Sequence, residues 1–394
     1  MLLESKNFIL SFQLTPNKNI CISAVNIRKG GTLTVLRDCL SYLSGRKDLN
    51  VTALVYKKSL CEFEGISYIE IPWSIKGWGR RLWCEYVTMG KISKKMDEEP
   101  DLWLSLHDTT PRVKAKHQAV YCHTSFPFMK IRLRDFRMDF KIPLFSIFTR
   151  YAYRIFSRRN DYLIVQQEWF KKGLSSLIGF PEEKIIVAPP SFKTVPIPAV
   201  ASDDTDDRGS KQTVFFYPST PDCHKNFELV CDASSILENK FGPDRFKVVL
   251  TLDGCENKYA SCLLKSWGHL SSIDFHGYMS KEELGLHYSN ADCLVFTSRI
   301  ETWGLPISEF SVTGKPMILS DLPYAHESAA GCRNIAFSRI DDPSALALLM
   351  EEVITGEMPS FGPVGEMPHG GLYAGSWDDL FNILLPSSST LQTS

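Results

Sequence analysis

The chain has 394 residues, of which 44% are hydrophobic and 23% charged, and its formal net charge is -1 at neutral pH. This length suits two domains of ordinary size, and the composition excludes a disordered chain. The near-zero net charge excludes a protein whose overall field attracts nucleic acid, so any basic surface must be local.

Short β-branched runs alternate with longer amphipathic stretches through the first half of the chain. The predicted strands are Ile20–Val25, Val51–Tyr56, Leu102–Leu106, Ala119–Cys122, Leu163–Val165 and Ile185–Ala188. Helices are predicted over Leu33–Leu43 and Arg81–Met96. Continuous apolar strands joined by helices indicate a parallel sheet that is covered on both faces. The expected fold class is therefore α/β, with a first Rossmann-like domain over residues 1–190.

A linker is predicted at 191–212, where prolines precede an acidic, serine-containing run that can bury little surface. The alternation then restarts, which indicates a second Rossmann-like domain over 213–374. Its predicted strands are Val214–Tyr217, Lys247–Leu252, Ile273–His276, Cys293–Thr297 and Pro316–Ser320. Its predicted helices are Asn226–Phe241, Lys258–Trp267, Lys281–Tyr288, Leu305–Thr313 and Pro343–Thr355, and a last helix is expected within 375–394.

The cysteine pattern and the apolar runs bear on the compartment. Eleven cysteines lie between Cys21 and Cys332 without a Cys-x-x-Cys pair, so free thiols in a reducing compartment are expected. The first residues show no basic start followed by an apolar run, and no stretch approaches the about 20 apolar residues of a spanning helix. We expect a cytoplasmic chain that is soluble or lies on a membrane surface.

Two glutamates flank a strand-to-helix junction in the second domain. Glu301 follows the predicted strand Cys293–Thr297, and Glu309 lies in the helix beyond it. Ligands of open α/β sheets bind outside the carboxyl ends of the strands, where carboxylates accept paired hydrogen bonds from sugar or ribose hydroxyls. On spacing alone, ordinary surface acids explain the pair equally well. The intervening candidates for donor binding are Thr302, Trp303, Gly304 and Leu305.

The segment from Ser298-Arg299-Ile300-Glu301 through Glu309 to Gly314-Lys315-Pro316 resembles the Glu-x7-Glu signature of the family 4 retaining glycosyltransferases, group 1 type. The resemblance covers residues 215–360. It implies a GT-B fold of two facing domains, with a nucleotide-sugar donor mainly on the second domain and the acceptor mainly on the first. It also implies retention of configuration and a last helix that crosses back to the first domain. No Asp-x-Asp motif follows a strand, so we expect no metal requirement.

A second signal opens the same domain at His224-Lys225-Asn226, where a strand leads into a helix. Helix N-termini suit phosphate, and Lys225 could neutralise a diphosphate leaving group or be an ordinary solvated lysine. The resemblance implies the first role. Relatives commonly add an arginine five residues earlier, where this chain has Thr220. His224 and Arg299 are the candidates to replace that cation.

The first domain contributes three further candidates. Gly30 and Gly31 follow a predicted strand, where glycines let the backbone approach a ligand or simply make a turn. The resemblance implies a loop that closes over the donor phosphates and the acceptor. His123 also ends a predicted strand and is similar to the family's mid-domain histidine, which positions the donor sugar. His107 and Asp108 are the second choice, and a core or capping histidine is the alternative for both His123 and His107.

Residues 126–159 are aromatic and basic, with nine lysines and arginines against two aspartates. Such a segment suits anionic headgroups, or it is a solvated helical hairpin. No RNA-binding motif accompanies it, so no nucleic acid is expected. The resemblance implies a lipid-linked saccharide acceptor, as in bacterial O-antigen, capsule or exopolysaccharide biosynthesis, and an enzyme peripheral on the inner face of the cytoplasmic membrane. The alternatives are a nucleotide-sugar epimerase on the same scaffold and a degenerate transferase that acts as a scaffold, to which Thr220 gives some support.

Overall fold

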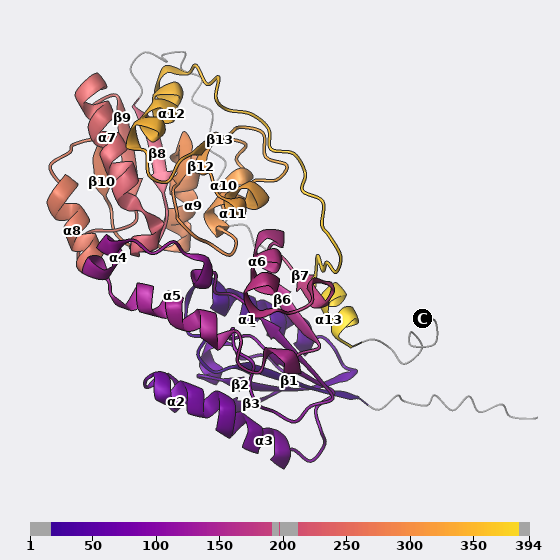
Figure 1. The fold of residues 1–394 in the computed structure, drawn as a ribbon. Helices are drawn as coiled ribbons and strands as arrows, with labels where there is room; N and C mark the ends of the chain where they lie inside the picture. Colours follow the sequence, from indigo (N-terminus) through magenta and orange to yellow (C-terminus); the bar gives the residue numbers. More distant parts are fainter. Residues whose placement is uncertain (1–16, 191–196, 198–211, 386–394) are drawn as a thin grey trace, which may run out of the picture. The chain divides into compact units, whose positions relative to one another are not determined.

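A computed structural model describes residues 17–190, 197 and 212–385, arranged around two parallel sheets (Figure 1). Within these residues the chain divides into two compact units. The first holds 17–107, 111–119 and 384–385, and the second holds 108–110 and 120–383. The predicted linker 191–212, except for 197 and 212, lies outside the described residues. The strands of the first sheet lie within the predicted domain 1–190, and those of the second lie within 213–374. These domain boundaries stay a prediction.

The first sheet has the strand order β3-β2-β1-β4-β5-β6-β7. Its strands are β1 (Lys18–Ala24), β2 (Leu49–Val55), β3 (Ile66–Glu70), β4 (Leu102–Ser105), β5 (His117–Tyr121), β6 (Tyr162–Val165) and β7 (Ile185–Val187). Its helices are α1 (Gly30–Ser44), α2 (Trp78–Trp83), α3 (Met89–Lys95), α4 (Leu133–Met138), α5 (Lys141–Ala152) and α6 (Glu168–Ile178). A π-helix, Cys84–Thr88, joins α2 to α3. The order reverses between β1 and β4, which is the point where doubly wound sheets bind ligands.

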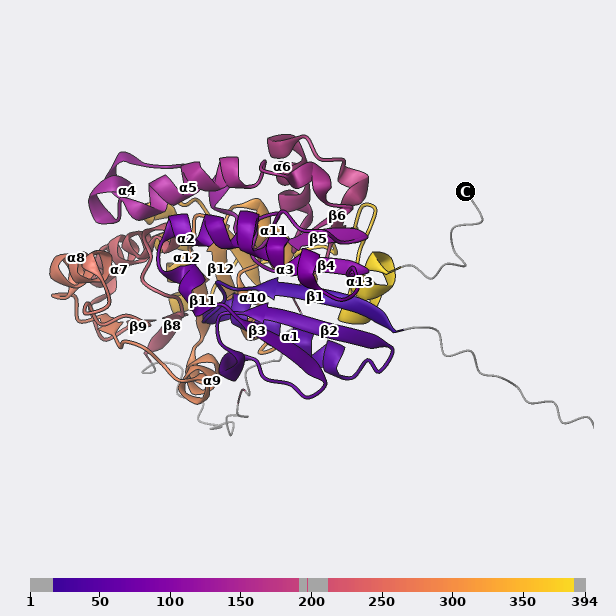
Figure 2. The same ribbon diagram turned by 90° about the horizontal axis from the view of Figure 1, so that it is seen from below.

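Helices cover both faces of β1 and β4, which explains why most of β1 and all of β4 are buried. Ile20 to Ala24 are buried throughout. Cys84 and Met89 of the α2–α3 run pack with Cys21 and Trp103 in one cluster. Figure 1 draws α1 and α3 on opposite sides of β1–β3, and Figure 2 shows these three strands side by side.

The second sheet has the order β10-β9-β8-β11-β12-β13, with its reversal between β8 and β11. Its strands are β8 (Thr213–Tyr217), β9 (Phe246–Leu250), β10 (Ile273–Phe275), β11 (Cys293–Phe296), β12 (Met317–Ser320) and β13 (Ile335–Ser338). Its helices are α7 (Phe227–Phe241), α8 (Lys258–Trp267), α9 (Lys281–Asn290), α10 (Leu305–Ser311), α11 (Pro323–Ser328) and α12 (Pro343–Thr355), and α13 (Trp377–Leu384) follows.

Local sequence signals explain where several of these helices begin. α9 starts at a capping box in which Ser280 and Glu283 satisfy each other's backbone N–H groups. α12 starts after Asp342, whose carboxylate caps the helix, and has Pro343 at its first position. After α12 the chain returns to β7, where Val187 donates to Leu372 O at 3.0 Å and Ala374 donates to Val187 O at 2.9 Å. Trp377 of α13 then lies beside Tyr121, with 6.3 Å between the ring centroids.

The predicted α/β class with two parallel sheets is confirmed. The strands β3 and β13 and the helices α6 and α11 were not predicted. The helix predicted over Arg81–Met96 is interrupted by the π-helix Cys84–Thr88. All eleven cysteines are free thiols, as expected, and eight of them are buried. Within the described parts of the chain, no helix combines the length and the apolar character needed to cross a membrane.

Candidate functional site

Two loops meet at the reversal point of the second sheet. One follows β8 and carries Lys225, and the other follows β11 and carries Glu301. Lys225 Nζ forms an ion pair with Glu301 Oε1, and the two side chains are only 13% and 16% exposed. The ammonium group also lies 5.7 Å from the ring centroid of Phe296, the last residue of β11. The structure therefore brings together Lys225 and Glu301, two predicted site residues of opposite charge.

Backbone contacts fix these two loops against each other. The Arg299 N–H donates to His224 O at 2.7 Å, and the Thr297 hydroxyl donates to the carbonyl of Asn226 at 3.3 Å. The Tyr217 hydroxyl donates to the Lys225 carbonyl. Asn226 itself has a left-handed backbone, with φ of 61°, which suits asparagine and turns the chain into α7. Lys225 is thus held by its own main chain and by that of its neighbours.

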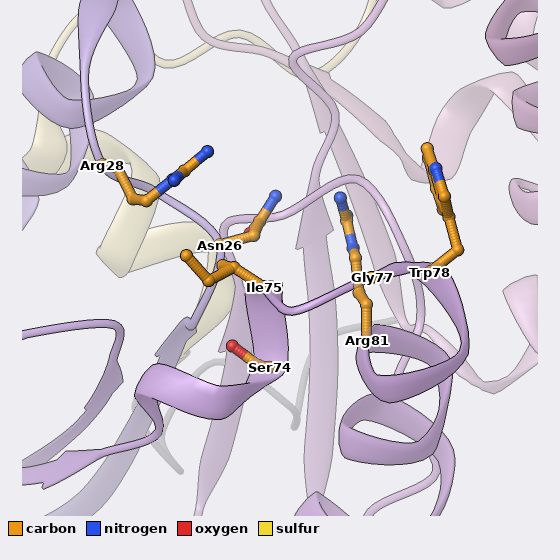
Figure 3. Close-up of a pocket in the computed structure, with 7 residues that line it drawn as sticks. All are labelled: Asn26, Arg28, Ser74, Ile75, Gly77, Trp78 and Arg81. Carbon is orange, nitrogen blue, oxygen red and sulfur yellow. The ribbon is translucent and has the colours of Figure 1, made fainter. Parts of the chain in front are cut away.

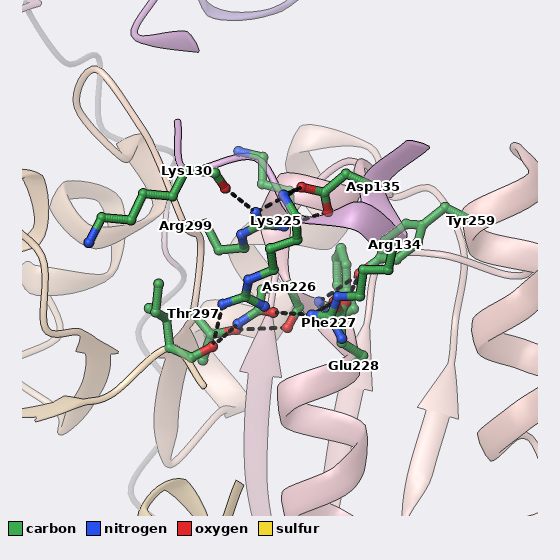
Figure 4. A network of polar contacts seen from close by, with 12 residues as sticks. Lys130, Arg134, Asp135, Lys225, Asn226, Phe227, Glu228, Tyr259, Thr297 and Arg299 are labelled. Atoms are coloured by element: carbon green, nitrogen blue, oxygen red, sulfur yellow. Dashed lines mark hydrogen bonds and ion pairs between the residues drawn. The ribbon is translucent and has the colours of Figure 1, made fainter. Parts of the chain in front are cut away.

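Arg299 is buried and fully engaged with α4 (Figure 4). Its two terminal nitrogens donate to the Asp135 carboxylate at 2.8 and 2.9 Å, and one of them also donates to Lys130 O at 2.6 Å. Burial acts to lower the pKa of Arg299, but the hydrogen bonds to Asp135 outweigh it and raise the pKa. The Arg299 charge is therefore balanced inside the protein, while its predicted role as a donor-binding cation stays a prediction.

His224 lies next to Lys225 and is 8% exposed. Burial, together with the charges of Lys225 and Arg299, lowers its pKa well below the usual range, so the imidazole is neutral. Its Nδ1 has no hydrogen-bond partner among the residues that the structure describes. Phe126 packs edge-on against the ring at 5.0 Å. This side chain can hydrogen-bond a ligand, but it carries no positive charge to replace the arginine that relatives have at the Thr220 position.

Gly304 shapes the loop between Glu301 and α10. Its φ is +85°, and a Cβ placed there would lie 3.1 Å from Ile307 Cδ1 and 3.4 Å from Phe296. Only glycine meets both conditions. Trp303 Nε1 donates to Ser308 at 2.9 Å, so the indole is tied to α10. Thr302 and Leu305 are half-buried in the same run.

Glu309 lies in α10 and accepts a hydrogen bond from the Tyr288 hydroxyl at 2.8 Å. Burial raises the pKa of Glu309, and the bond from Tyr288 offsets this only in part. A carboxylate that is costly to ionise and half-buried is typical of a functional position as well as of a structural one. No feature of the sequence indicated Tyr288 as its partner.

His123 follows β5, and its ring stacks on Tyr121 with centroids 4.5 Å apart. Asp108 accepts hydrogen bonds from the backbone N–H groups of His123 and Thr124 at 2.6 and 2.9 Å, and from the Thr124 and Tyr153 hydroxyls at 2.8 and 3.0 Å. Asp108 is itself left-handed, with φ of 70°. Asp108 therefore holds the loop that carries His123, a supporting role that the sequence did not reveal.

In the first unit, Gly30 and Gly31 open α1, and Gly30 has φ of +72° with open space where a Cβ would lie. His107 is 1% exposed, and its ring lies 3.1 Å from Ser23 Oγ and 3.4 Å from Glu85 Oε1. His107 is thus part of a buried polar cluster. Across 17–190, 197 and 212–385, no group of three or more His, Cys, Asp or Glu side chains is placed to hold a metal ion. Independence from metal stays a prediction.

The two parallel α/β sheets define the fold, which is of the GT-B type. Residues 203–360 match the family model described as glycosyl transferases group 1, a segment that contains Lys225, Glu301 and Glu309. The match, on this fold, supports a glycosyltransferase as the class of enzyme. No curated protein sequence matches the chain.

Three solved structures illustrate what this fold is similar to. Sucrose-phosphate synthase (tll1590) from Thermosynechococcus elongatus has a TM-score of 0.60 at 13% identity, over 86% of this chain and 90% of that one. Alr3699/HepE from Anabaena, in complex with UDP-glucose, has a TM-score of 0.59 at 15% identity, over 87% and 92%. WaaG, a glycosyltransferase involved in lipopolysaccharide biosynthesis, has a TM-score of 0.60 at 14% identity, over 85% and 90%. At these identities the likeness establishes the fold.

Proposed function

We propose that the protein is a retaining glycosyltransferase of family 4 that uses a nucleotide-diphosphate sugar. The contact between Lys225 and Glu301 at the carboxyl ends of β8 and β11 carries this proposal. It pairs a cation suited to a diphosphate with a carboxylate suited to sugar hydroxyls, at the reversal point where such sheets bind ligands. Glu309 would accept hydrogen bonds from a ribose diol, and His224 Nδ1 would bond the donor. His123 would position the donor sugar.

In the proposed reaction, Lys225 stabilises the negative charge that develops on the departing diphosphate. The bond between the sugar's anomeric carbon and the phosphate oxygen breaks, and the acceptor oxygen bonds to the same face of that carbon. The acceptor's proton passes to the departing phosphate oxygen. Glu301, released from Lys225, would hold the sugar's hydroxyls during this exchange. Gly30 and Gly31 would let the main chain approach the donor phosphates.

The proposed acceptor is a lipid-linked saccharide of bacterial surface polysaccharide biosynthesis. Residues 126–159 support a peripheral position on the inner face of the cytoplasmic membrane. The apolar side chains that they expose are Leu133, Phe136, Phe140, Leu144, Ile147, Phe148, Tyr151, Ile155 and Phe156. Apolar side chains among arginines and lysines suit an anionic lipid surface. One structural relative is involved in lipopolysaccharide biosynthesis, which points the same way, and another is bound to UDP-glucose, which supports a nucleotide-sugar donor.

The test is a transfer assay on the full chain with a panel of nucleotide sugars, a lipid-diphosphate-sugar extract and a chelator. Release of nucleoside diphosphate and the mass of the lipid product are both measured. Lys225→Ala and Glu309→Gln are expected to lower transfer at least a hundredfold. Lys265→Ala and Glu282→Gln are the matched controls, since both side chains are exposed and lie on α8 and α9.

Acceptor-dependent transfer that the two site variants lose would support the proposal. Interconversion of the donor sugar without an acceptor would indicate the epimerase instead. Donor binding without turnover would indicate the scaffold, and transfer that requires a divalent cation would contradict the metal-free mechanism.

A further inference from the structure

The first unit contains a pocket of about 210 Å³ at the carboxyl ends of β1 and β3 (Figure 3). Pockets for drug-sized ligands measure roughly 300–1,000 Å³, so this one suits a single sugar ring or a group of similar size. In Figure 3 the ends of Asn26 and Arg81 point the same way, and the guanidinium of Arg28 points toward them. The lining residues are Asn26, Arg28, Ser74, Ile75, Gly77, Trp78 and Arg81.

The two arginines make the pocket attractive to an anion. Arg28 is exposed, and its guanidinium lies 5.9 Å from the ring centroid of Tyr56. Arg81 is 19% exposed and reaches the pocket from α2. The planar guanidinium group of Arg28 can bond carboxylate or phosphate oxygens in a pair, whereas most N–H groups of Arg81 are engaged within the protein, so Arg81 contributes mainly its charge. The Glu85 carboxylate pairs with Arg81 and balances its charge, so the charge of Arg28 leaves the pocket with a net positive charge.

A buried chain of hydrogen bonds holds Arg81 in place. Arg81 Nε donates to Glu85 Oε1 at 2.9 Å, and one terminal nitrogen donates to His107 O at 3.0 Å. The Asn26 amide oxygen, in the orientation that its bonds require, accepts from Arg81 at 3.1 and 3.3 Å. Behind Glu85, the ring of His107 connects to Ser23. An arginine fixed on all sides loses little conformational freedom when it binds a ligand.

Glu85 takes its place in this series of hydrogen bonds because it lies in the π-helix Cys84–Thr88. Glu85 is 0% exposed, an unusual position for a carboxylate unless it is paired. Short π-helical segments within α-helices are frequent at functional sites. Trp78, at the start of α2, is 51% exposed, and its ring lies 5.8 Å from the Arg81 guanidinium carbon. Its aromatic face can cover the C–H face of a sugar ring.

We propose that this pocket is the acceptor site and that it takes a saccharide carrying an anionic group. Arg28 and Arg81 bind the anion, a phosphate ester or a carboxylate, and Trp78 packs on the sugar ring. Glu85 and His107 are positioning residues that act through Arg81. This inference rests on the proposed glycosyltransferase function, since it specifies the chemistry of the acceptor.

The test measures binding to the full chain by titration calorimetry with three groups of probes. These are glucose 1-phosphate and a farnesyl-diphosphate-linked glucose, then glucuronate, then methyl glucoside as the neutral reference. We expect at least tenfold tighter binding of an anionic probe than of the neutral one. Arg28→Ala should remove this preference, while Arg80→Ala, an exposed neighbour on α2 that does not line the pocket, should keep it. Trp78→Ala should weaken all probes alike and leave their ratio unchanged.

Arg81→Ala leaves Glu85 buried without its main partner and can fail to fold, so Arg28→Ala decides the matter. The phosphate probes could also bind at the proposed diphosphate site of the second unit. Repeating the titration in Lys225→Ala removes that contribution. Equal affinity for charged and neutral probes, no binding of any probe, or a preference that survives Arg28→Ala would overturn the inference. A nucleotide-sugar titration on the same sample separates this failure from failure of the proposed function. If the donor binds and the probes show no preference, only the acceptor inference is wrong.

Discussion

The buried ion pair between Arg299 and Asp135 gives the sharpest test of how the second unit is held together. Both side chains are 2% exposed, and two hydrogen bonds join them at 2.8 and 2.9 Å. Asp135→Ala leaves an arginine buried without its counter-charge. Breaking a buried pair in this way costs about 3–5 kcal/mol of unfolding free energy. For a domain of about 150–250 residues, that loss lowers the thermal midpoint by about 10 °C.

The pH dependence of this pair has a definite sign. Burial acts to raise the pKa of Asp135, but the hydrogen bonds from Arg299 and from the Arg132 N–H outweigh it and lower the pKa. A lowered carboxyl pKa stabilises the folded state above the unfolded pKa, and this stability is lost as pH falls through the folded pKa. The stability difference between the wild type and Asp135→Ala should therefore shrink in acid.

The assay is urea unfolding followed by circular dichroism, with Asp244→Ala as the control because that aspartate is exposed. The double variant Asp135→Leu with Arg299→Met should recover most of the stability, since apolar replacement of a buried pair is often neutral. A loss below about 1 kcal/mol in Asp135→Ala would refute the reasoning. If the stable double variant also loses donor affinity, Arg299 contacts the donor; if it keeps that affinity, Arg299 is structural.

Two further predictions concern α10 and the loop that leads into it. Burial raises the pKa of Glu309, so nucleotide-sugar affinity should weaken as pH falls through that raised value, while folding stability should rise. Calorimetry from neutral pH down through the ordinary glutamate pKa of about 4.5 should show this dependence in the wild type and its loss in Glu309→Gln, and identical profiles would contradict it. Gly304→Ala should cost about 2–4 kcal/mol, because a side chain there is both left-handed and within 3.1 Å of Ile307. Gly314→Ala, with φ of +67° and open space, should cost about 1–2 kcal/mol in the same unfolding assay, and equal losses would contradict the contact argument.

The sequence was sufficient for the parts of the fold that depend on local pattern. Long apolar strands and amphipathic helices predicted both sheets, and the bounds of α8 and α12 agree with the prediction. The strands β3 and β13 were missed, and each lies at an edge of its sheet; β3 is only partly buried, so no continuous apolar run marks it.

The candidate site also has a part that the sequence predicts and a part that it does not. Lys225 and Glu301 could be predicted to approach each other because each follows a strand at the reversal point of one sheet. The partner of Arg299 could not be predicted, since Asp135 lies 164 positions earlier in the chain. The acceptor pocket was missed for a related reason. Arg28 was visible beside Gly30 and Gly31, but nothing in the sequence connects it with Arg81.

The π-helix Cys84–Thr88 has a consequence for how this chain can vary. A π segment amounts to one extra residue in an α-helical run, and each residue of an α-helix turns the chain by about 100°. Deleting a single residue there would rotate α3, with its buried Met89, by about that angle relative to Arg81. A shortened chain could keep either the core contacts of α3 or the Arg81–Glu85 pair, but not both. The number of residues in this segment therefore determines both how α3 packs and whether Glu85 reaches Arg81.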